Sequence, residues 1–304
     1  MPKQFLYALI MKMNKYFKLF ACCIPVRGYR RSVLMDTQRI NFELIPNELF
    51  EILKKTESLT VDEIIKEYGK ANRCVIEDYF QFLTVNEFGF YTSEPTLFPP
   101  INNECHSPRK INNGIIDYAE NSKYNIGNAI HLMDAIGAEA IQIRLFDHCS
   151  KEFIIEDIIK NLNNTTRIRT FELLMKHDEN LTPDLINMLV VSCIGLSKLT
   201  VHSSPQNKRL RDYKTCIVHC IKTEIKNETC CGYVSPGIFN TALPFVLESM
   251  NNNSCLNKKI SVSQTGEIKN CPAMKEVFGN INDPTNFNID SYLCSDSYIK
   301  TSKI

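Results

Sequence analysis

The segment Ile141-Gln142-Ile143-Arg144-Leu145-Phe146 decides the fold of the middle of this chain. Its apolar residues alternate with Gln142 and Arg144, and a period of two is typical of a β-strand. Similar apolar segments before and after it predict further strands at residues 115–118, 168–173 and 199–201. Apolar residues at helical spacing lie between them, at residues 126–136, 154–162 and 182–189.

Repeated strand–helix units predict a parallel sheet, because a helical crossover joins parallel neighbours. About four such units fit before the pattern ends near Pro205, so we expect an α/β partial barrel over residues 108–210. No GxGxxG turn or P-loop follows any of these strands, which argues against the corresponding nucleotide sites. Barrel sites usually form at the carboxyl ends of strands, where His202 and the run Asp147-His148-Cys149 are candidates.

Residues 14–98 predict a separate α+β unit of the winged-helix type. Short strands are expected at residues 17–26, 32–36 and 41–45, with a wing-like strand at 89–91. Pro46 opens the first of three helices, and Thr60 with Glu63 forms a capping box at the start of the second. The third helix carries an apolar stripe that includes Tyr79. Residues 97–103, with two adjacent prolines, form the linker that follows.

Composition limits the function without naming it. The chain has 304 residues, of which 44% are apolar and 23% charged, and its net charge is +1, as in an ordinary folded domain. Residues 1–40, however, hold eight lysines and arginines against the single acid Asp36, a patch that suits an acidic peptide or a phosphate backbone. No apolar run approaches the roughly 18–20 residues that cross a bilayer, so no membrane partner is expected.

The cysteines point to thiol chemistry. Without an export signal we expect the cytoplasm, where thirteen cysteines would not form a disulfide framework. Cys22 and Cys23 fall inside a predicted strand, so their side chains are expected on opposite faces, unable to chelate together. Residues 211–304 form a cysteine-rich tail in which short strands at 260–263 and 267–269 flank the turn Thr265-Gly266.

That predicted hairpin brings its end cysteines, Cys255 and Cys271, side by side. Two thiolates are half of a tetrahedral metal or cluster site, and Cys231 and Cys294 complete the predicted set of four. One iron–sulfur cluster (4Fe–4S), one zinc ion, or reduced cysteines without metal all remain open. No residue is predicted to be catalytic, and whether the chain is an enzyme is also open.

The tail resembles the opening half of a SPASM domain, and the chain from Asn14 to about Ile281 is similar to the SPASM-domain maturase of grasp-with-spasm peptide systems. The resemblance rests on residues 18–28, 141–146, 255–260, 269–272 and 278–281 (KLFACCIPVRG, IQIRLF, CLNKKI, KNCP and FGNI). It implies a role beside an ATP-grasp ligase in modifying a ribosomally made precursor peptide. It also implies that residues 14–98 recognise the precursor's leader.

Two departures from that family restrict the expected chemistry. The loop after the first barrel strand, residues 120–125, lacks the CxxxCxxC cysteines that hold a radical S-adenosylmethionine cluster, which argues against S-adenosylmethionine as a cofactor. After Cys271 the tail offers Cys294 alone, so the SPASM cysteine set is incomplete and looks truncated.

The first hypothesis is therefore a peptide maturation factor. The leader would add a strand beside the third predicted strand and pack against the third helix. The predicted contact residues are Asn41, Phe42, Glu43, Leu44, Ile45 and Tyr79. The alternatives are a winged-helix DNA-binding regulator and a non-catalytic scaffold without metal. Glu77 and Asp78 on the third helix argue against nucleic acid as a partner, because they repel phosphates.

Overall fold

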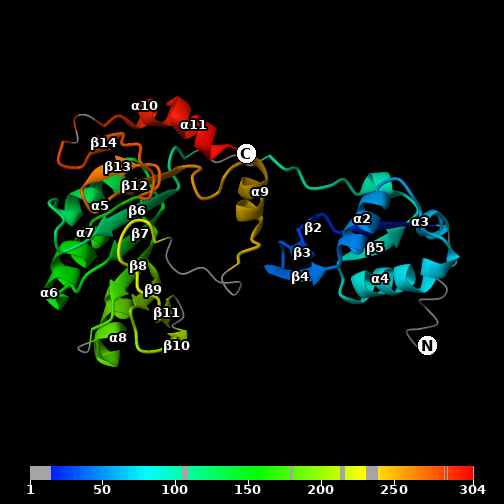
Figure 1. Ribbon diagram of the computed structural model, residues 1–304, viewed down its shortest axis with the longest axis horizontal. Helices are drawn as coiled ribbons and strands as arrows, with labels where there is room; N and C mark the ends of the chain where they lie inside the picture. Colours follow the sequence, from blue (N-terminus) through cyan, green and yellow to red (C-terminus); the bar gives the residue numbers. More distant parts are fainter. Residues whose placement is uncertain are drawn as a thin grey trace. The chain divides into compact units, whose positions relative to one another are not determined.

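The computed structural model describes residues 15–104, 109–178, 181–212, 216–230, 239–283, 285 and 287–303. The chain forms two compact units (Figure 1). Unit 1 comprises residues 1–105 and 238–251, and unit 2 comprises residues 106–237 and 252–304. Each unit has its own hydrophobic core. None of the helices in the described ranges is both long enough and apolar enough to span a membrane.

Unit 1 contains two small antiparallel sheets. Strand β1 (Tyr16–Leu19) pairs with β5 (Gly89–Thr92), and β2 (Cys23–Val26), β3 (Ser32–Asp36) and β4 (Asn41–Ile45) form a meander in the order β2-β3-β4. The single strand expected over residues 17–26 is therefore wrong. A turn at Phe20, closed by the Cys23 amide donating to the Phe20 carbonyl at 2.8 Å, carries the chain from one sheet to the other.

Three helices cover these strands: α2 (Asn47–Lys55), α3 (Val61–Tyr68) and α4 (Arg73–Val85). Short 3-10 turns, η1 (Lys70–Asn72) and η2 (Pro95–Leu97), flank α4 and the wing strand. The predicted capping box is confirmed, because Glu63 accepts from the Thr60 amide at 2.8 Å and Thr60 accepts from the Glu63 amide. The winged-helix class itself stays a prediction.

Helix α9 (Leu243–Asn251) comes from the cysteine-rich tail but belongs to unit 1. Its Val246 is buried against Ile24 and Met35, and Asn251 donates to the Asn103 carbonyl at 2.7 Å. The tail therefore contributes a packing element to the first unit.

Unit 2 is built on one sheet, which has nine strands within the described ranges, in the order β10-β11-β9-β8-β7-β6-β12-β13-β14. The central six, from β12 to β11, run parallel. The strands are β6 (Asn113–Tyr118), β7 (Ala140–Leu145), β8 (Thr170–Lys176), β9 (Leu196–His202), β10 (Lys208–Asp212), β11 (Ile217–Cys220), β12 (Lys259–Val262), β13 (Glu267–Lys269) and β14 (Gly279–Asn280). The predicted domain boundary between residues 210 and 211 falls inside this sheet, and the partial-barrel class stays a prediction.

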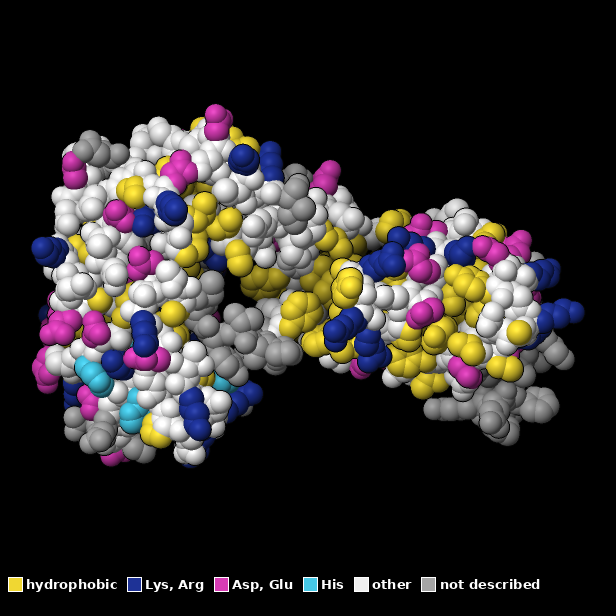
Figure 2. All heavy atoms as spheres, in the orientation of Figure 1, with side chains coloured by type: hydrophobic (Ala, Val, Ile, Leu, Met, Phe, Trp, Pro, Cys, Tyr) yellow, Lys and Arg dark blue, Asp and Glu magenta, His cyan; other side chains and the backbone are white. Residues whose placement is uncertain are grey.

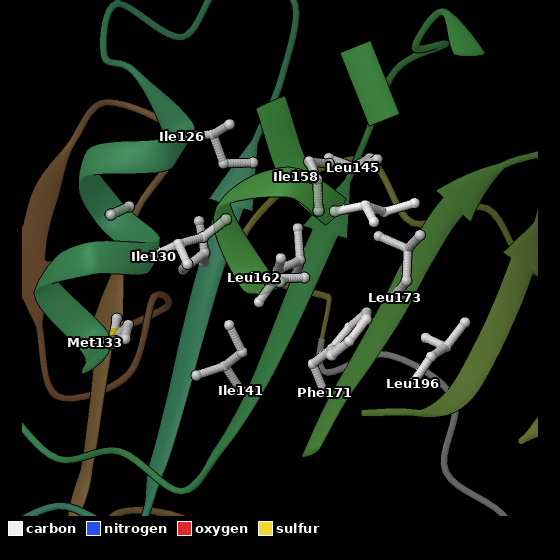
Figure 3. Close-up of a cluster of buried hydrophobic side chains, with 14 of the residues drawn as sticks. Ile126, Ile130, Met133, Ile141, Leu145, Ile158, Leu162, Phe171, Leu173 and Leu196 are labelled. Atoms are coloured by element: carbon white, nitrogen blue, oxygen red, sulfur yellow. The ribbon is translucent and has the colours of Figure 1, made fainter. Parts of the chain in front are cut away.

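One face of the sheet is apolar and covered by helices. These are α5 (Ile126–Ala135), α6 (Lys151–Phe153), the π-helical η3 (Ile154–Ile159), α7 (Lys160–Asn163) and α8 (Pro183–Ser192). Ile130 of α5, Ile158 of η3 and Leu162 of α7 point toward Ile141, Phe171 and Leu173 of the strands (Figure 3). The short helices α10 (Ile289–Leu293) and α11 (Asp296–Ser302) add Tyr292 and Tyr298 to the same core. Because alternate strand residues enter this core, the intervening residues line the opposite face. Polar side chains lie there beside a small buried apolar cluster that includes Phe146 and Leu174.

Candidate functional site

The polar face of the sheet is organised by a buried ion pair. Asp117 on β6 and Arg144 on β7 are cross-strand partners, with 0% and 3% of their surfaces exposed. Arg144 Nε and Nη2 each donate to one carboxylate oxygen of Asp117 at 2.6 Å. The alternation of Gln142 and Arg144 predicts a polar face here, but the partner of Arg144 was missed because strand register cannot be deduced from a single strand.

Arg144 also fixes the segment that follows β11. Its Nη1 donates to the Cys230 carbonyl at 2.6 Å, so one guanidinium joins β6, β7 and a loop 86 residues further along the chain. Burial raises the pKa of Asp117; the hydrogen bonds from Arg144 oppose that shift, and the nearby carboxylate of Glu228 adds to it. The site therefore holds two carboxylates, Asp117 and Glu228, close enough to affect one another.

Hydrogen-bonding capacity remains unused around this face. Glu228 Oε2 and Thr200 Oγ1 are buried, and neither has a hydrogen-bond partner among the described residues. A buried polar atom without a partner costs about 1–3 kcal/mol, so such atoms are favourable contacts for a bound group.

A hollow of about 440 Å³ lies at the carboxyl ends of β6, β7 and β12. It is lined by Ala119, Glu120, Asn121, Asp147, Lys226 and Gln264. The Glu120 amide donates to Asp147 Oδ2 at 3.0 Å, and Ser122 Oγ donates to the Gln264 carbonyl at 2.8 Å, which holds the strand-end loops together. Carboxyl ends of parallel strands are the usual position of α/β sites, and the mixed charges suit a small polar group or a peptide backbone.

The candidates at strand ends have different environments. His202 is fully buried; its Nε2 donates to the Leu145 carbonyl at 3.1 Å, and burial is the main cause that lowers its pKa. It therefore acts as a neutral structural side chain. His148 lies 3.8 Å from Asp178 at the surface, whereas burial raises the pKa of Cys149 to about 11 and keeps it a thiol.

The predicted cysteine hairpin forms. Strands β12 and β13 pair with Ser261 opposite Lys269, and Gly266 turns the chain with φ of 85°. Cys255 is exposed in the turns that precede β12, and Cys271 is half-buried two residues after the end of β13. Cys294 is exposed at the end of α10.

Two polar side chains tie together the segments that carry these cysteines. Asn270 Nδ2 donates to the Leu256 carbonyl at 2.9 Å and to the Tyr292 hydroxyl at 2.7 Å, and the Tyr292 hydroxyl donates to the Lys259 carbonyl. Leu256, Asn270 and Tyr292 are each within two residues of a predicted cysteine ligand. The network thus brings the backbones near Cys255, Cys271 and Cys294 together.

The thiols themselves do not converge as a set. Across the described ranges, the ligand atoms of Cys255, Cys271 and Cys294 do not all lie within 4.8 Å of one another. Cys231 lies outside the described residues. The four-cysteine metal site therefore stays a prediction.

The predicted peptide-binding residues lie on β4 and α4. Asn41 and Glu43 are exposed, Leu44 is 50% exposed and Phe42 is half-buried. Ile45 is buried in the core of unit 1, so its side chain is not available to a peptide. Tyr79 packs against the same core, and burial raises its pKa, with Glu48 adding to that shift. On the visible surface of unit 1, hydrophobic side chains lie beside lysines and arginines (Figure 2).

Comparisons with known proteins leave the family open. No family model matches the chain, and no curated protein matches it. Among solved structures it is similar to Streptococcus suis SuiB bound to S-adenosylmethionine, with a TM-score of 0.29 and 10% identity, over 94% of this chain and 88% of that chain. It is also similar to SuiB bound to the precursor peptide SuiA, with a TM-score of 0.24 and 9% identity over the same shares. TM-scores this low establish neither a shared fold nor a shared function.

The buried ion pair can be tested by its contribution to stability. Arg144→Met should lower the free energy of unfolding by about 3–5 kcal/mol, because it leaves the Asp117 carboxylate buried without a counter-charge. The double variant Asp117→Leu/Arg144→Met removes both charges and should recover much of that loss. Urea unfolding followed by circular dichroism measures both.

The exposed pair of Lys160 and Glu156 provides the matched control. Lys160→Met should cost less than about 1 kcal/mol, as surface pairs usually do. A double variant no more stable than Arg144→Met would contradict the assignment of the loss to the unpaired charge.

Proposed function

We propose that the protein takes part in the maturation of a ribosomally made peptide, and that unit 1 binds the leader segment of the precursor. The observation that carries the proposal is the edge position of β4, which pairs with β3 and with no other strand of the described chain. An edge strand presents unpaired amides and carbonyls that an extended peptide can join as an additional strand.

The side chains around β4 suit this mode of binding. Phe42 is in edge-to-face contact with Phe239 at 5.1 Å, and Thr241 donates to the Asn41 carbonyl at 3.3 Å. These contacts cover the start of β4, so the accessible part centres on Glu43 and Leu44. The half-exposed Leu44 supplies an apolar contact for one side chain of the peptide.

Charge favours an acidic leader. Arg30 and Arg31 are exposed and form no ion pair with the described residues. Arg31 Nη2 donates to the Leu44 carbonyl at 2.9 Å, which puts a guanidinium at β4. An added strand that paired with this carbonyl would displace the guanidinium and leave it for an acidic side chain of the peptide. Opposite charges on the two partners would accelerate their association. On α4, by contrast, Arg73 is paired with Glu77 at 2.8 Å, so that helix offers little positive charge to a nucleic acid.

Unit 2 would handle the rest of the precursor. In this proposal the polar face and the strand-end hollow hold the core peptide for a partner, an ATP-grasp ligase, in the cytoplasm. Cys231, Cys255, Cys271 and Cys294 would hold one iron–sulfur cluster of the 4Fe–4S type, with a zinc ion or no metal as alternatives. The hydrogen bonds of Asn270 and Tyr292 support this assignment, because they bring three of the four ligand-bearing segments together.

Peptide binding can be tested on the full chain by fluorescence anisotropy. The probes are labelled peptides translated from short reading frames that flank the gene. One of them should bind saturably at tens of micromolar or tighter. Leu44→Glu should weaken it by on the order of tenfold, because a charge on an edge strand opposes strand addition.

Val85→Glu is the matched control, since Val85 is also an exposed apolar residue but lies at the end of α4. It should leave the affinity unchanged. Equal losses in both variants, or no saturable binding by any of the peptides, would contradict the proposal.

The cluster can be tested by anaerobic purification. The protein should be brown and hold roughly four iron and four sulfide per chain. The variant Cys255→Ser/Cys271→Ser should lose both elements, whereas Cys74→Ser, at an exposed cysteine of unit 1, should retain them. A colourless preparation whose zinc is lost in Cys255→Ser/Cys271→Ser would favour the zinc alternative, and one in which no metal depends on these two cysteines would favour the scaffold alternative.

A further inference from the structure

A second group of cysteines lies in unit 1, where β1 turns into β2. The ligand atoms of Cys22, Cys23 and Asp36 all lie within 4.8 Å of one another, and the two sulfurs are 4.0 Å apart. Within the described ranges, this is the one group of three or more metal-ligating side chains that meets this limit. The expectation that Cys22 and Cys23 point to opposite faces is wrong, because Cys22 lies in the turn and Cys23 begins the strand.

The backbone holds this group in place. The Cys22 carbonyl accepts from the Thr37 amide at 2.9 Å and from the Thr37 hydroxyl at 3.0 Å. Cys23 and Asp36 are direct cross-strand partners of β2 and β3, which places their side chains on the same face. The sheet and the turn therefore fix the three ligand positions. All three side chains are short, so little side-chain freedom is lost when a cation binds.

The geometry fits a cation that prefers thiolates. Two thiolates bound to one tetrahedral zinc ion at 2.3 Å have their sulfurs about 3.8 Å apart, close to the separation present here. We propose that Cys22, Cys23 and Asp36 bind a divalent cation of the zinc class, with a fourth position left for water or another ligand. This site is distinct from the predicted site in the tail.

The cation has a route to the site. Cys23 lines a pocket of about 280 Å³ in unit 1, together with Phe20, Ala21 and Ile101. Cys22 is half-buried, so its sulfur is also partly accessible. Gln38 Oε1 lies 3.6 Å from the Cys22 sulfur and is an additional oxygen near the site.

Asp36 can accept a cation without losing its structural role. One oxygen, Oδ1, accepts from the amides of Gln38 and Arg39 at 3.0 and 2.9 Å, and the other, Oδ2, is 3.2 Å from Arg39 Nη1. Arg39 is half-exposed and also pairs with Glu87 at 2.5 Å. When the cation binds Asp36 Oδ2, Arg39 therefore retains its ion pair with Glu87.

Charge and protons balance. Binding forms two metal–sulfur bonds and one metal–oxygen bond to Asp36, which replace water ligands of the hydrated cation, and it releases the two thiol protons to solvent. The charges of the dication and the two thiolates cancel, so the net charge of the site, Asp36 and Arg39 included, stays at zero. No oxidant or reductant is required.

The test uses Co²⁺ as a spectroscopic probe for the zinc class. The full-length protein carries Cys231→Ser, Cys255→Ser, Cys271→Ser and Cys294→Ser, which removes the four predicted tail ligands, and is kept reduced and free of oxygen. Titration should give one equivalent of Co²⁺ with thiolate-to-cobalt charge-transfer absorption. Adding Cys22→Ser or Cys23→Ser should abolish this absorption. Asp36→Asn should weaken Co²⁺ binding by at least roughly 10–100-fold. This is the loss in metal affinity that follows when a residue supporting a metal ligand is replaced.

Cys74→Ser in the same background is the control and should leave the titration unchanged. Circular dichroism of each variant checks folding, and Cys22→Ser keeps the test decisive because Cys22 is not fully buried. Absence of the absorption in the background protein, its persistence after both Cys22 and Cys23 are replaced, or full affinity in Asp36→Asn would each overturn the site. None of these outcomes depends on peptide binding at β4, so this proposal and the proposed function fail separately.

Discussion

The ion pair between Asp117 and Arg144 is the constraint on which unit 2 depends. A parallel sheet is normally apolar on both faces, because helices cover both. Here helices pack on one face, and the other face buries an aspartate and an arginine, which is tolerable only because each neutralises and hydrogen-bonds the other. The same guanidinium also donates to the Cys230 carbonyl. This hydrogen bond fixes the loop after β11 to the polar face, and the loop in turn helps to bury Arg144.

The two cysteine groups are positioned by different means. Near β12 and β13, hydrogen bonds from the Asn270 side chain and the Tyr292 hydroxyl connect the backbone segments. The thiols in these segments, Cys255, Cys271 and Cys294, are exposed or half-buried. At the turn before β2 the sheet itself sets Cys23 against Asp36, and the adjacent Cys22 adds the third ligand. The second arrangement is complete before any ligand binds, whereas the first requires its thiols to move together.

Local chemistry explains what could be predicted from the sequence. Gly266 adopts a positive φ, so Thr265-Gly266 correctly predicts the hairpin, and Thr60 with Glu63 correctly predicts the start of α3. The period of two through Ile141–Leu145 predicts β7. These features depend on residues a few positions apart, where spacing alone carries the information.

What could not be predicted depends on partners distant in sequence. The chain changes sheets after Phe20 because β1 pairs with β5, which lies about 70 residues later. This distant pairing is not visible in the local sequence, so the apolar residues 17–26 were predicted to form one strand. Helix α9 joins unit 1 through Ile24 and Met35, more than 200 residues earlier, and the pairing of Asp117 with Arg144 requires the register of β6 and β7. The group formed by Cys22, Cys23 and Asp36 was missed for the same reason as the change of sheet.

Hydrogen–deuterium exchange of the full chain, with and without the best-binding flanking peptide, tests the central claim most directly, because that claim concerns which backbone groups a peptide joins. The account predicts slower exchange in β4, at the amides that face away from β3, when the peptide is bound, with little change in β7 and β8. Bound peptide that leaves β4 exchange unchanged and protects another surface would contradict it.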